Sequence, residues 1–443
     1  MSQLARHKHN QPNLDDALEA AHAVYSAKHA KSLVAYDEAT EVMPGGNTRS
    51  VLYHEPYPFR ACKGAGATLS DVDGNRYLNL LGEYTAGLFG HDDPTIRAAV
   101  VGALDGGINL GAHNGFEPEF AALVCARFPS IDMVRFTNSG TEANLMAITT
   151  ARIATGRGKL LVFEGGYHGG AFYFKPGVVT NAPFPWIVTA YNDVEGAVAA
   201  IRAHGDDLAA VLVEPMMGSA GCIPGSEAFL GALREECTRV GSLLIFDEVM
   251  TSRLAPGGAQ ALYGITPDIT TLGKWIGGGM SFGAFGGRED LMALYDPRRP
   301  DALPHAGTFN NNVLTMAAGI AALAQIYTPE RAIAHNARGD ALRDRINQIA
   351  KEEGVALTAS GIGSLMNLHP TASALTNYRD AAAVDDRLRA LLFFDLLDAG
   401  FYIARRGFMA LSLAVGDDDI DAFTEALRAL CQRRAPLFAI GDQ

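Results

Sequence analysis

Features that mark several other protein classes are missing from this sequence of 443 residues. Its five cysteines are odd in number and include no C-x-x-C pair, which argues against a disulfide framework and a zinc site. The twelve histidines include no H-E-x-x-H motif, and no apolar run is long enough to span a membrane. Residues 1–35 are polar and charged, without a signal-peptide core. We therefore expect no metal site and a cytoplasmic location.

Positive charge is also scarce. The chain has 36 Lys and Arg against 49 Asp and Glu, a formal net charge of −13. This balance disfavours nonspecific binding to nucleic acids or anionic membranes. An acidic substrate must therefore be bound by locally placed arginines. The remaining composition, 48% hydrophobic and 19% charged, is typical of a globular protein with a substantial core.

Short apolar strands alternate with helical stretches between about residues 90 and 325. The clearest expected strands are 134–137, 159–163, 210–213, 243–246 and 269–272. This alternation predicts an α/β fold in which helices cover a mostly parallel sheet. We expect three parts, namely an N-terminal segment (1–85), a large domain (86–325) and a small α+β domain (326–443).

The two flanking parts have their own patterns. In the N-terminal segment we expect a helix over 14–37 and a hairpin of 68–72 with 77–80, and we expect this segment to pack with the small domain. The small domain is expected to contain helices near 330–352, 380–399 and 418–432 and strands near 363–368 and 408–413.

Lys274 is the most informative residue. It stands in a glycine-rich loop after the expected strand 269–272, and the apolar run 243–246 ends in Asp247. Open α/β sheets bind ligands at the carboxyl ends of their strands. A lysine that can form a Schiff base and an aspartate that can hold a protonated pyridine nitrogen are the two protein groups that pyridoxal phosphate requires. Taken alone, each has a plainer interpretation, a solvated loop lysine and a strand cap.

A strand, a turn of small residues and a helix start follow one another over residues 134–153. The turn contains Ser139, Gly140 and Thr141, whose backbone N–H groups and hydroxyls lie at the positive end of the helix dipole and suit a phosphate. Ser139 and Glu142 also fit an ordinary capping box. The turn matches neither G-x-G-x-x-G nor G-x-x-x-x-G-K-[ST], which disfavours nicotinamide and nucleoside triphosphate cofactors.

Two further residues follow neighbouring strands. Tyr167 comes after the strand 159–163 and could lie on a flat cofactor ring, although a tyrosine there is more often loop packing. Glu214 closes the strand 210–213 and could equally be a buried hydrogen-bond anchor with no part in catalysis.

Together these residues resemble the class III aminotransferases of fold type I, which use pyridoxal 5′-phosphate. The resemblance covers about residues 40–415 and rests on the segments 138–143, 165–169, 213–215, 246–249, 272–274 and 307–310. It implies that Lys274 forms the Schiff base and shuttles a proton, and that Asp247 pairs with the pyridinium nitrogen. It also implies that the phosphate is bound by Ser139, Gly140 and Thr141.

The resemblance implies further roles around the ring. Tyr167 stacks on one face, Val249 packs on the other, and Glu214 belongs to the cofactor-binding set. Thr308 reaches the phosphate of the neighbouring subunit, which implies a homodimer with shared active sites.

Two groups within the family compete. The chain resembles glutamate-1-semialdehyde aminomutase at residues 44–47 and 247–251 but departs from it at 252–256 and 308–312. It is most similar to the aromatic β-amino-acid (β-phenylalanine) aminotransferases, although their closest pattern has glutamine where this chain has Met217. The segments that carry this similarity are 47–51, 83–87 and 406–408.

The implied reaction is ping-pong transfer of the amino group of an aromatic β-amino acid, such as β-phenylalanine, to 2-oxoglutarate or pyruvate. By the same resemblance Arg49 holds the carboxylate of the β-amino acid, and Arg406 engages the distal carboxylate of 2-oxoglutarate. The plainer interpretation makes both surface loop arginines. The alternatives are the aminomutase, another ω-amino-acid transaminase, and a catalytically silent cofactor-binding or regulatory protein.

Overall fold

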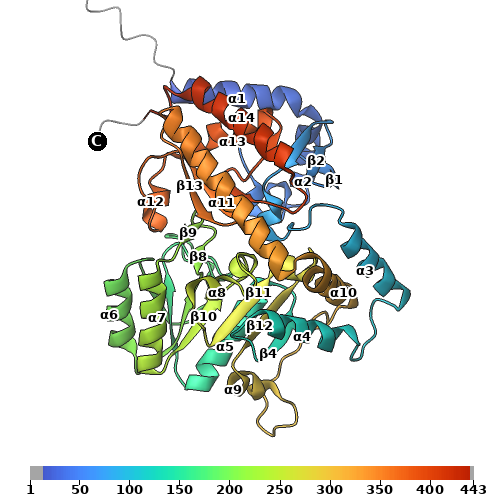
Figure 1. Ribbon diagram of the computed structural model, residues 1–443, viewed down its shortest axis with the longest axis vertical. Helices are drawn as coiled ribbons and strands as arrows, with labels where there is room; N and C mark the ends of the chain where they lie inside the picture. Colours follow the sequence, from blue (N-terminus) through green and yellow to red (C-terminus); the bar gives the residue numbers. More distant parts are fainter. Residues whose placement is uncertain (1–12, 440–443) are drawn as a thin grey trace, which may run out of the picture.

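A seven-stranded sheet in the order β4-β12-β11-β10-β7-β5-β6 forms the centre of the computed structural model, which describes residues 13–439 (Figure 1). All neighbouring strands run parallel except β12, which is antiparallel to both β11 and β4. The α/β fold with a mostly parallel sheet is therefore confirmed. The strands are β4 (Met133–Thr137), β5 (Lys159–Phe163), β6 (Trp186–Thr189), β7 (Leu208–Val213), β10 (Leu243–Asp247), β11 (Ile269–Gly273) and β12 (Gly283–Gly287).

Helices pack on both faces of this sheet because its central strands β5, β7 and β10 are largely apolar. Within β5, Leu160 packs with Ile148 of α5 (Gly140–Thr155), while Leu161 packs on the other face with Leu230 of α7 (Glu227–Val240). Continuous apolar strands of this kind are typical of parallel sheets buried on both sides. The other elements of this part are α3 (Pro94–Asp105), α4 (Phe116–Arg127), α6 (Val194–His204), β8 (Met216–Met217), β9 (Ile223–Pro224), α8 (Ala259–Tyr263), α9 (Glu289–Met292) and α10 (Val313–Ala321).

The two ends of the chain build a second apolar core, in the upper half of Figure 1. The short strand β15 near the C-terminus pairs in parallel with β3 near the N-terminus, so the two ends share one sheet. Within residues 13–439 there is no helix with the length and apolarity to cross a membrane. The elements are α1 (Leu14–Lys28), α2 (Ala30–Thr40), β1 (Ala61–Ala65), β2 (Thr68–Asp71), β3 (Arg76–Asn79), α11 (Pro329–Glu352), β13 (Thr358–Ile362), β14 (Leu365–His369), α12 (Tyr378–Ala382), α13 (Asp386–Asp398), β15 (Phe401–Tyr402), β16 (Phe408–Ala410) and α14 (Asp417–Arg434).

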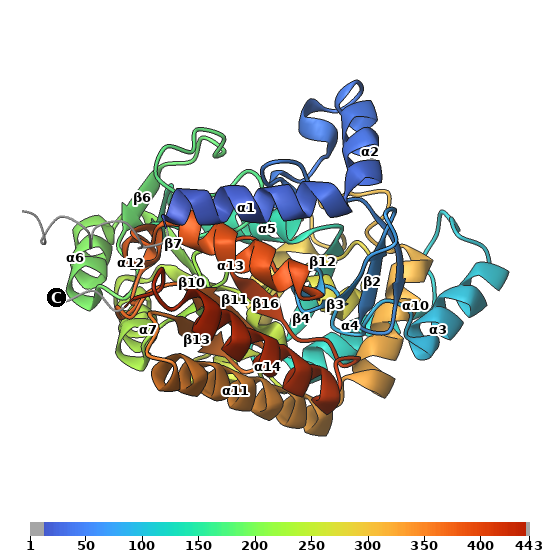
Figure 2. The same cartoon turned by 90° about the horizontal axis from the view of Figure 1, so that it is seen from above.

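The prediction of a single helix over 14–37 is wrong in one respect, because the helix is interrupted at His29 and two helices form. The imidazole of His29 lies 2.7 Å from the carbonyl oxygen of Tyr25 through Nδ1 and 2.7 Å from the hydroxyl of Tyr77 through Nε2. This side chain bonds to a carbonyl that the next helical turn would otherwise use. Figure 2 shows α2 leaving the direction of α1 at this point. The helix expected over 380–399 is likewise two helices, since Asp385 caps a new start at Asp386.

Strand β12 was not predicted, because three of its five residues are glycines. Glycine is unfavourable in strands unless another backbone must come close. Here a Cβ on Gly283 would lie 2.1 Å from the carbonyl oxygen of Ser139. The glycine therefore lets β12 pass directly beneath the turn that precedes α5. Strand β13, rich in small polar residues, was also missed.

Candidate active site

A cavity of about 560 Å³ opens at the carboxyl ends of β10 and β11. It collects most of the residues that the sequence pointed to, from segments far apart in the chain. Those that line it are Arg49, Ser139, Gly140, Thr141, Tyr167, Glu214, Asp247, Val249 and Lys274. Ligands bind at this edge in open α/β sheets.

The carboxylate of Asp247 is buried and held by three donors. Its Oδ2 accepts hydrogen bonds from Nδ1 of His168 at 2.7 Å and Nδ2 of Asn144 at 2.8 Å, and its Oδ1 accepts one from the backbone N–H of Val249 at 3.0 Å. The orientation of the carboxylate is thereby fixed. A fixed anion facing the cavity can pair with a cationic ring nitrogen.

Two of these donors were missed as functional residues, although His168 lies inside the recognised segment 165–169 and Asn144 directly follows the segment 138–143. Asn144 also accepts a hydrogen bond at 2.7 Å from the hydroxyl of Thr271 in β11, so it joins α5 to two strands. One signal was available, since Asn144 lies one helical turn after Gly140 and so on the same face of α5. For His168 the sequence offers only its position next to Tyr167.

Lys274 follows β11 with a backbone φ of 56°, in the left-handed region that lysine rarely adopts. Strained backbone of this kind gathers at functional sites. The indole N–H of the next residue, Trp275, donates to the hydroxyl of Ser252 at 2.9 Å and so anchors the turn. Burial lowers the pKa of the Lys274 amine to about 8, against the opposing effect of Asp247 and Glu214. A substantial neutral fraction makes this amine a usable nucleophile and base near neutral pH.

The turn before α5 is a helix cap and also has the chemistry of an anion site. Ser139 Oγ accepts a hydrogen bond from the N–H of Glu142 at 3.2 Å, so the capping interpretation holds. The N–H groups of Gly140 and Thr141, in the first helical turn, have no intrahelical partner and remain free for a ligand. A Cβ on Gly140 would come within 2.8 Å of a methyl group of Val249, which explains the glycine.

Glu214 and Tyr167 act as a pair. The carboxylate of Glu214 accepts hydrogen bonds from the N–H groups of Tyr167 at 3.0 Å and Gly218 at 2.9 Å. Burial raises the pKa of this carboxyl. Glu214 thus anchors the segment that carries the Tyr167 ring, which packs edge-on against Tyr173.

The two arginines expected to bind substrate both lie near one aromatic ring, that of Tyr84. The guanidinium carbon of Arg49 lies 5.6 Å from the centroid of Tyr84, and that of Arg406 lies 4.9 Å from the same centroid and 5.4 Å from Phe408. Arg49 also donates a hydrogen bond to the carboxylate of Glu83. Both Glu83 and Tyr84 line the cavity, whereas Arg406 is not among its lining residues.

Thr308 and Met217 lie elsewhere. Thr308 lines a separate cavity of about 650 Å³ together with residues 108–114, 309 and 311–313. Met217 is 1% exposed and packs in the apolar core beside β7.

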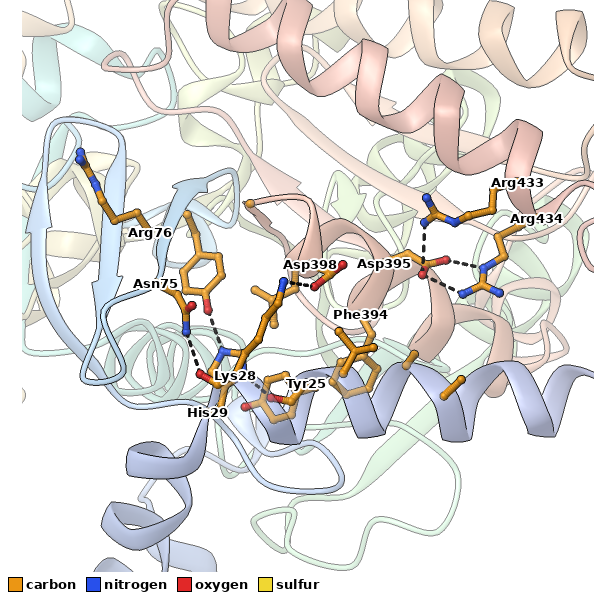
Figure 3. A pocket seen from close by; sticks show the side chains of 16 residues that line it. Tyr25, Lys28, His29, Asn75, Arg76, Phe394, Asp395, Asp398, Arg433 and Arg434 are labelled. Atoms are coloured by element: carbon orange, nitrogen blue, oxygen red, sulfur yellow. Dashed lines mark hydrogen bonds and ion pairs between the residues drawn. The ribbon is translucent and has the colours of Figure 1, made fainter.

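A further cavity, of about 340 Å³, lies between α1, α13 and α14 (Figure 3). Five of its charged side chains already form ion pairs, since Lys28 binds Asp398 and Asp395 binds both Arg433 and Arg434. It therefore offers less to a ligand than the Lys274 cavity does.

Comparison with known proteins agrees with the geometry. The sequence matches the profile of the family described as Aminotransferase class-III over residues 52–174 and 175–431. It is 54% identical, over 416 residues, to a β-phenylalanine transaminase of Variovorax paradoxus, covering 94% of this chain and 95% of that protein.

Solved structures give the same result. A crystal structure of β-phenylalanine aminotransferase from Variovorax paradoxus superposes with a TM-score of 0.95 at 52% identity, covering 97% of this chain and 100% of that one. A transaminase with PLP bound has a TM-score of 0.85 at 33% identity, with coverage of 92% and 98%. A glutamate-1-semialdehyde aminomutase of Pseudomonas aeruginosa has a TM-score of 0.86 at only 25% identity, with coverage of 94% and 97%.

Proposed function

Because the chain belongs to the class III aminotransferases, we propose that it transfers the amino group of an aromatic β-amino acid, such as β-phenylalanine, to a 2-oxo acid. The observation that best supports this proposal is that Lys274 and Asp247 share one cavity with Arg49. A second arginine, Arg406, lies close by at Tyr84. The aminomutase alternative is not favoured, since identity to that group is 25% against 54% to the β-phenylalanine transaminase.

The cavity fits pyridoxal phosphate at each of its chemical groups. Free N–H groups at the start of α5 suit the phosphate, the buried carboxylate of Asp247 suits the ring nitrogen, and the Lys274 amine suits the aldehyde. When bound, this cofactor supplies a ring that withdraws electrons from the bonds of the substrate's amino-bearing carbon. Tyr167 and Val249 would enclose the ring between them.

Four of the protein's own residues have a role in this mechanism. Asp247, fixed by His168 and Asn144, holds the proton on the ring nitrogen. Lys274 Nζ would accept the proton of the substrate's amino-bearing carbon and release it again within the cavity, which its lowered pKa permits. Arg49 binds the carboxylate of the β-amino acid in the first half-reaction. Arg406 binds the distal carboxylate of 2-oxoglutarate in the second.

We further propose a homodimer in which Thr308 serves the partner's site. Thr308 does not line the Lys274 cavity of its own chain, which supports a role elsewhere. Around it lie exposed apolar side chains, namely Ile108 (46% exposed), Leu110 (50%) and Phe309 (55%). A cluster of this kind is typical of a surface that a partner covers. We also propose a three-part division of the chain at residues 85 and 325 and a cytoplasmic location.

Hybrid dimers test the shared site. We expect Thr308→Ala to weaken cofactor binding about tenfold, because one hydrogen bond to a charged phosphate is lost. In a hybrid of one Thr308→Ala chain and one Lys274→Ala chain, the single intact lysine is served by the partner's intact threonine. That site should bind cofactor as tightly as the wild type does, as measured by absorbance titration. Weakened binding in the hybrid would place Thr308 in its own chain's site.

Arg406→Ala should raise the KM for 2-oxoglutarate about tenfold or more while largely sparing pyruvate. The reason is that only 2-oxoglutarate has a second carboxylate, and loss of a charge-assisted pair costs roughly 1.5–3 kcal/mol. Steady-state kinetics with each acceptor measure the split. Equal losses for both acceptors would show that Arg406 does not bind the second carboxylate.

The rate at which cofactor-free protein takes up pyridoxal phosphate should depend on pH through Lys274. Only the neutral amine reacts, and its pKa of about 8 lies below the ordinary value of 10.5. The rate should therefore rise about tenfold per pH unit below pH 8 and level off above it. Nα-acetyllysine is the control, since its rate keeps rising well beyond pH 9. A protein rate that rises in parallel with the control would contradict the lowered pKa.

A substrate panel tests the proposed function itself. Purified enzyme should be assayed with aromatic β-amino acids, α-amino acids and ω-amines as donors, against 2-oxoglutarate and pyruvate as acceptors. We expect the highest kcat/KM for β-phenylalanine or a close aromatic β-amino acid. A preference for ω-amines that lack a carboxylate would point instead to another ω-transaminase.

A further inference from the structure

Three consecutive residues at the rim of the cavity adopt left-handed backbone. Glu83, Tyr84 and Thr85 have φ values of 49°, 51° and 85°, and none of them is a glycine. Such conformations are disfavoured for residues with a side chain, and they gather where a function requires them. The result is that neighbouring side chains, those of Glu83 and Tyr84, both line the cavity.

The surrounding chain holds this segment in place. The side-chain oxygen of Asn79 accepts hydrogen bonds from the N–H groups of Leu81 at 3.0 Å and Gly82 at 3.1 Å. The N–H of Gly87 closes the turn by donating to the carbonyl of Gly82 at 3.0 Å. The direction of the Glu83 side chain is therefore set largely by the backbone.

The carboxylate of Glu83 accepts a hydrogen bond from Nη1 of Arg49. Under the proposed function, Arg49 is the residue that binds the carboxylate of the β-amino acid. Arg49 therefore already binds a carboxylate, which its own chain supplies. Both side chains are partly open to solvent, with exposed fractions of 43% for Arg49 and 54% for Glu83.

We propose that Glu83 is an internal stand-in for the substrate, whose carboxylate occupies Arg49 in the empty site and is displaced by that of the β-amino acid. This inference rests on the proposed function and deepens it. The exchange is easy because ion pairs between exposed side chains are weak, whereas a bound carboxylate can engage the guanidinium through two parallel hydrogen bonds. An amine without a carboxylate leaves the pair intact, so only ligands that carry a carboxylate compete with Glu83 for Arg49.

Binding of an unreactive carboxylate to the holoenzyme tests the exchange. The probe is 3-phenylpropanoate, which lacks the amino group, and calorimetry measures its dissociation constant. Glu83→Gln removes the competing charge and should tighten binding about two- to fivefold, the range that an exposed ion pair allows. Glu83→Asn should give the same gain, because asparagine tolerates left-handed backbone.

Three controls separate displacement from a general charge effect. The uncharged 3-phenylpropanamide should bind wild type and Glu83→Gln equally. Glu55→Gln removes the same charge from a carboxylate that bonds to Tyr53, and should leave the affinity unchanged. In an Arg49→Gln background, Glu83→Gln should add nothing.

Unchanged or weaker binding of 3-phenylpropanoate to both Glu83 variants would overturn the inference. So would an equal gain in the Arg49→Gln background, because the effect would then not pass through Arg49. If wild type neither binds the probe nor reacts with β-amino acids in the panel, the proposed function itself has failed. If the probe binds wild type and the Glu83 variants equally, only the proposed role of Glu83 is contradicted.

Discussion

Lys274→Ala should still bind pyridoxal phosphate but should lose transamination almost completely. In the proposed site the phosphate and ring contacts come from other residues that line the cavity, whereas the reactive amine and the proton shuttle are both removed. Positioned acid–base groups contribute about 10²- to 10⁴-fold in rate, and we expect a loss at the upper end of that range, because a covalent role is lost as well. Single-turnover kinetics with β-phenylalanine measure the loss.

Covalent trapping of the cofactor tests the role of Lys274 independently. Borohydride treatment of wild-type holoenzyme should fix the cofactor covalently, and peptide mass spectrometry should locate it on Lys274. Lys175→Ala, at a lysine that does not line the cavity, is the matched control and should behave as wild type. A Lys274→Ala enzyme that turned over at near wild-type rate would refute the assignment.

Asp247→Asn should slow the chemical step by about a hundred- to a thousandfold, the cost typical of removing one preorganised electrostatic partner. The amide keeps the shape of the carboxylate but cannot stabilise a protonated ring nitrogen. Cofactor affinity should fall much less, because the phosphate contacts remain. Stopped-flow measurement of the first half-reaction, alongside a cofactor titration, separates the two effects.

Glu214→Gln is the matched control for this charge. It removes a second buried carboxylate from the same cavity, but one that bonds to the backbone N–H groups of Tyr167 and Gly218. The chemical step should therefore fall far less than in Asp247→Asn. If Asp247→Asn altered affinity alone, Asp247 would be a structural residue.

The parts predicted well from the sequence are those with a local signal. The strands β5, β7 and β10 are largely continuous apolar runs, and their order along the chain implied the parallel sheet and the edge where the cavity lies. The residues around Lys274 and Asp247 were found because family motifs carry them. The structure brings them to one cavity, as the resemblance implied.

The parts that were missed depend on contacts between distant segments. Strand β12 exists because glycine lets it pass beneath Ser139, and the helix break at His29 depends on Tyr77. Likewise, the ion pair of Arg49 with Glu83 joins positions with no shared motif. None of these contacts leaves a periodic or compositional pattern, so sequence reasoning could not have found them.

Mixing holoenzyme with β-phenylalanine in the absence of any 2-oxo acid tests the central claim most directly. An aminotransferase with one reacting lysine per cavity should release one equivalent of β-keto acid per active site and then stop. Adding 2-oxoglutarate should restart turnover, because the amino group held by the enzyme then has an acceptor. Continued conversion without an acceptor would show an aminomutase, and no release at all would contradict the proposed function.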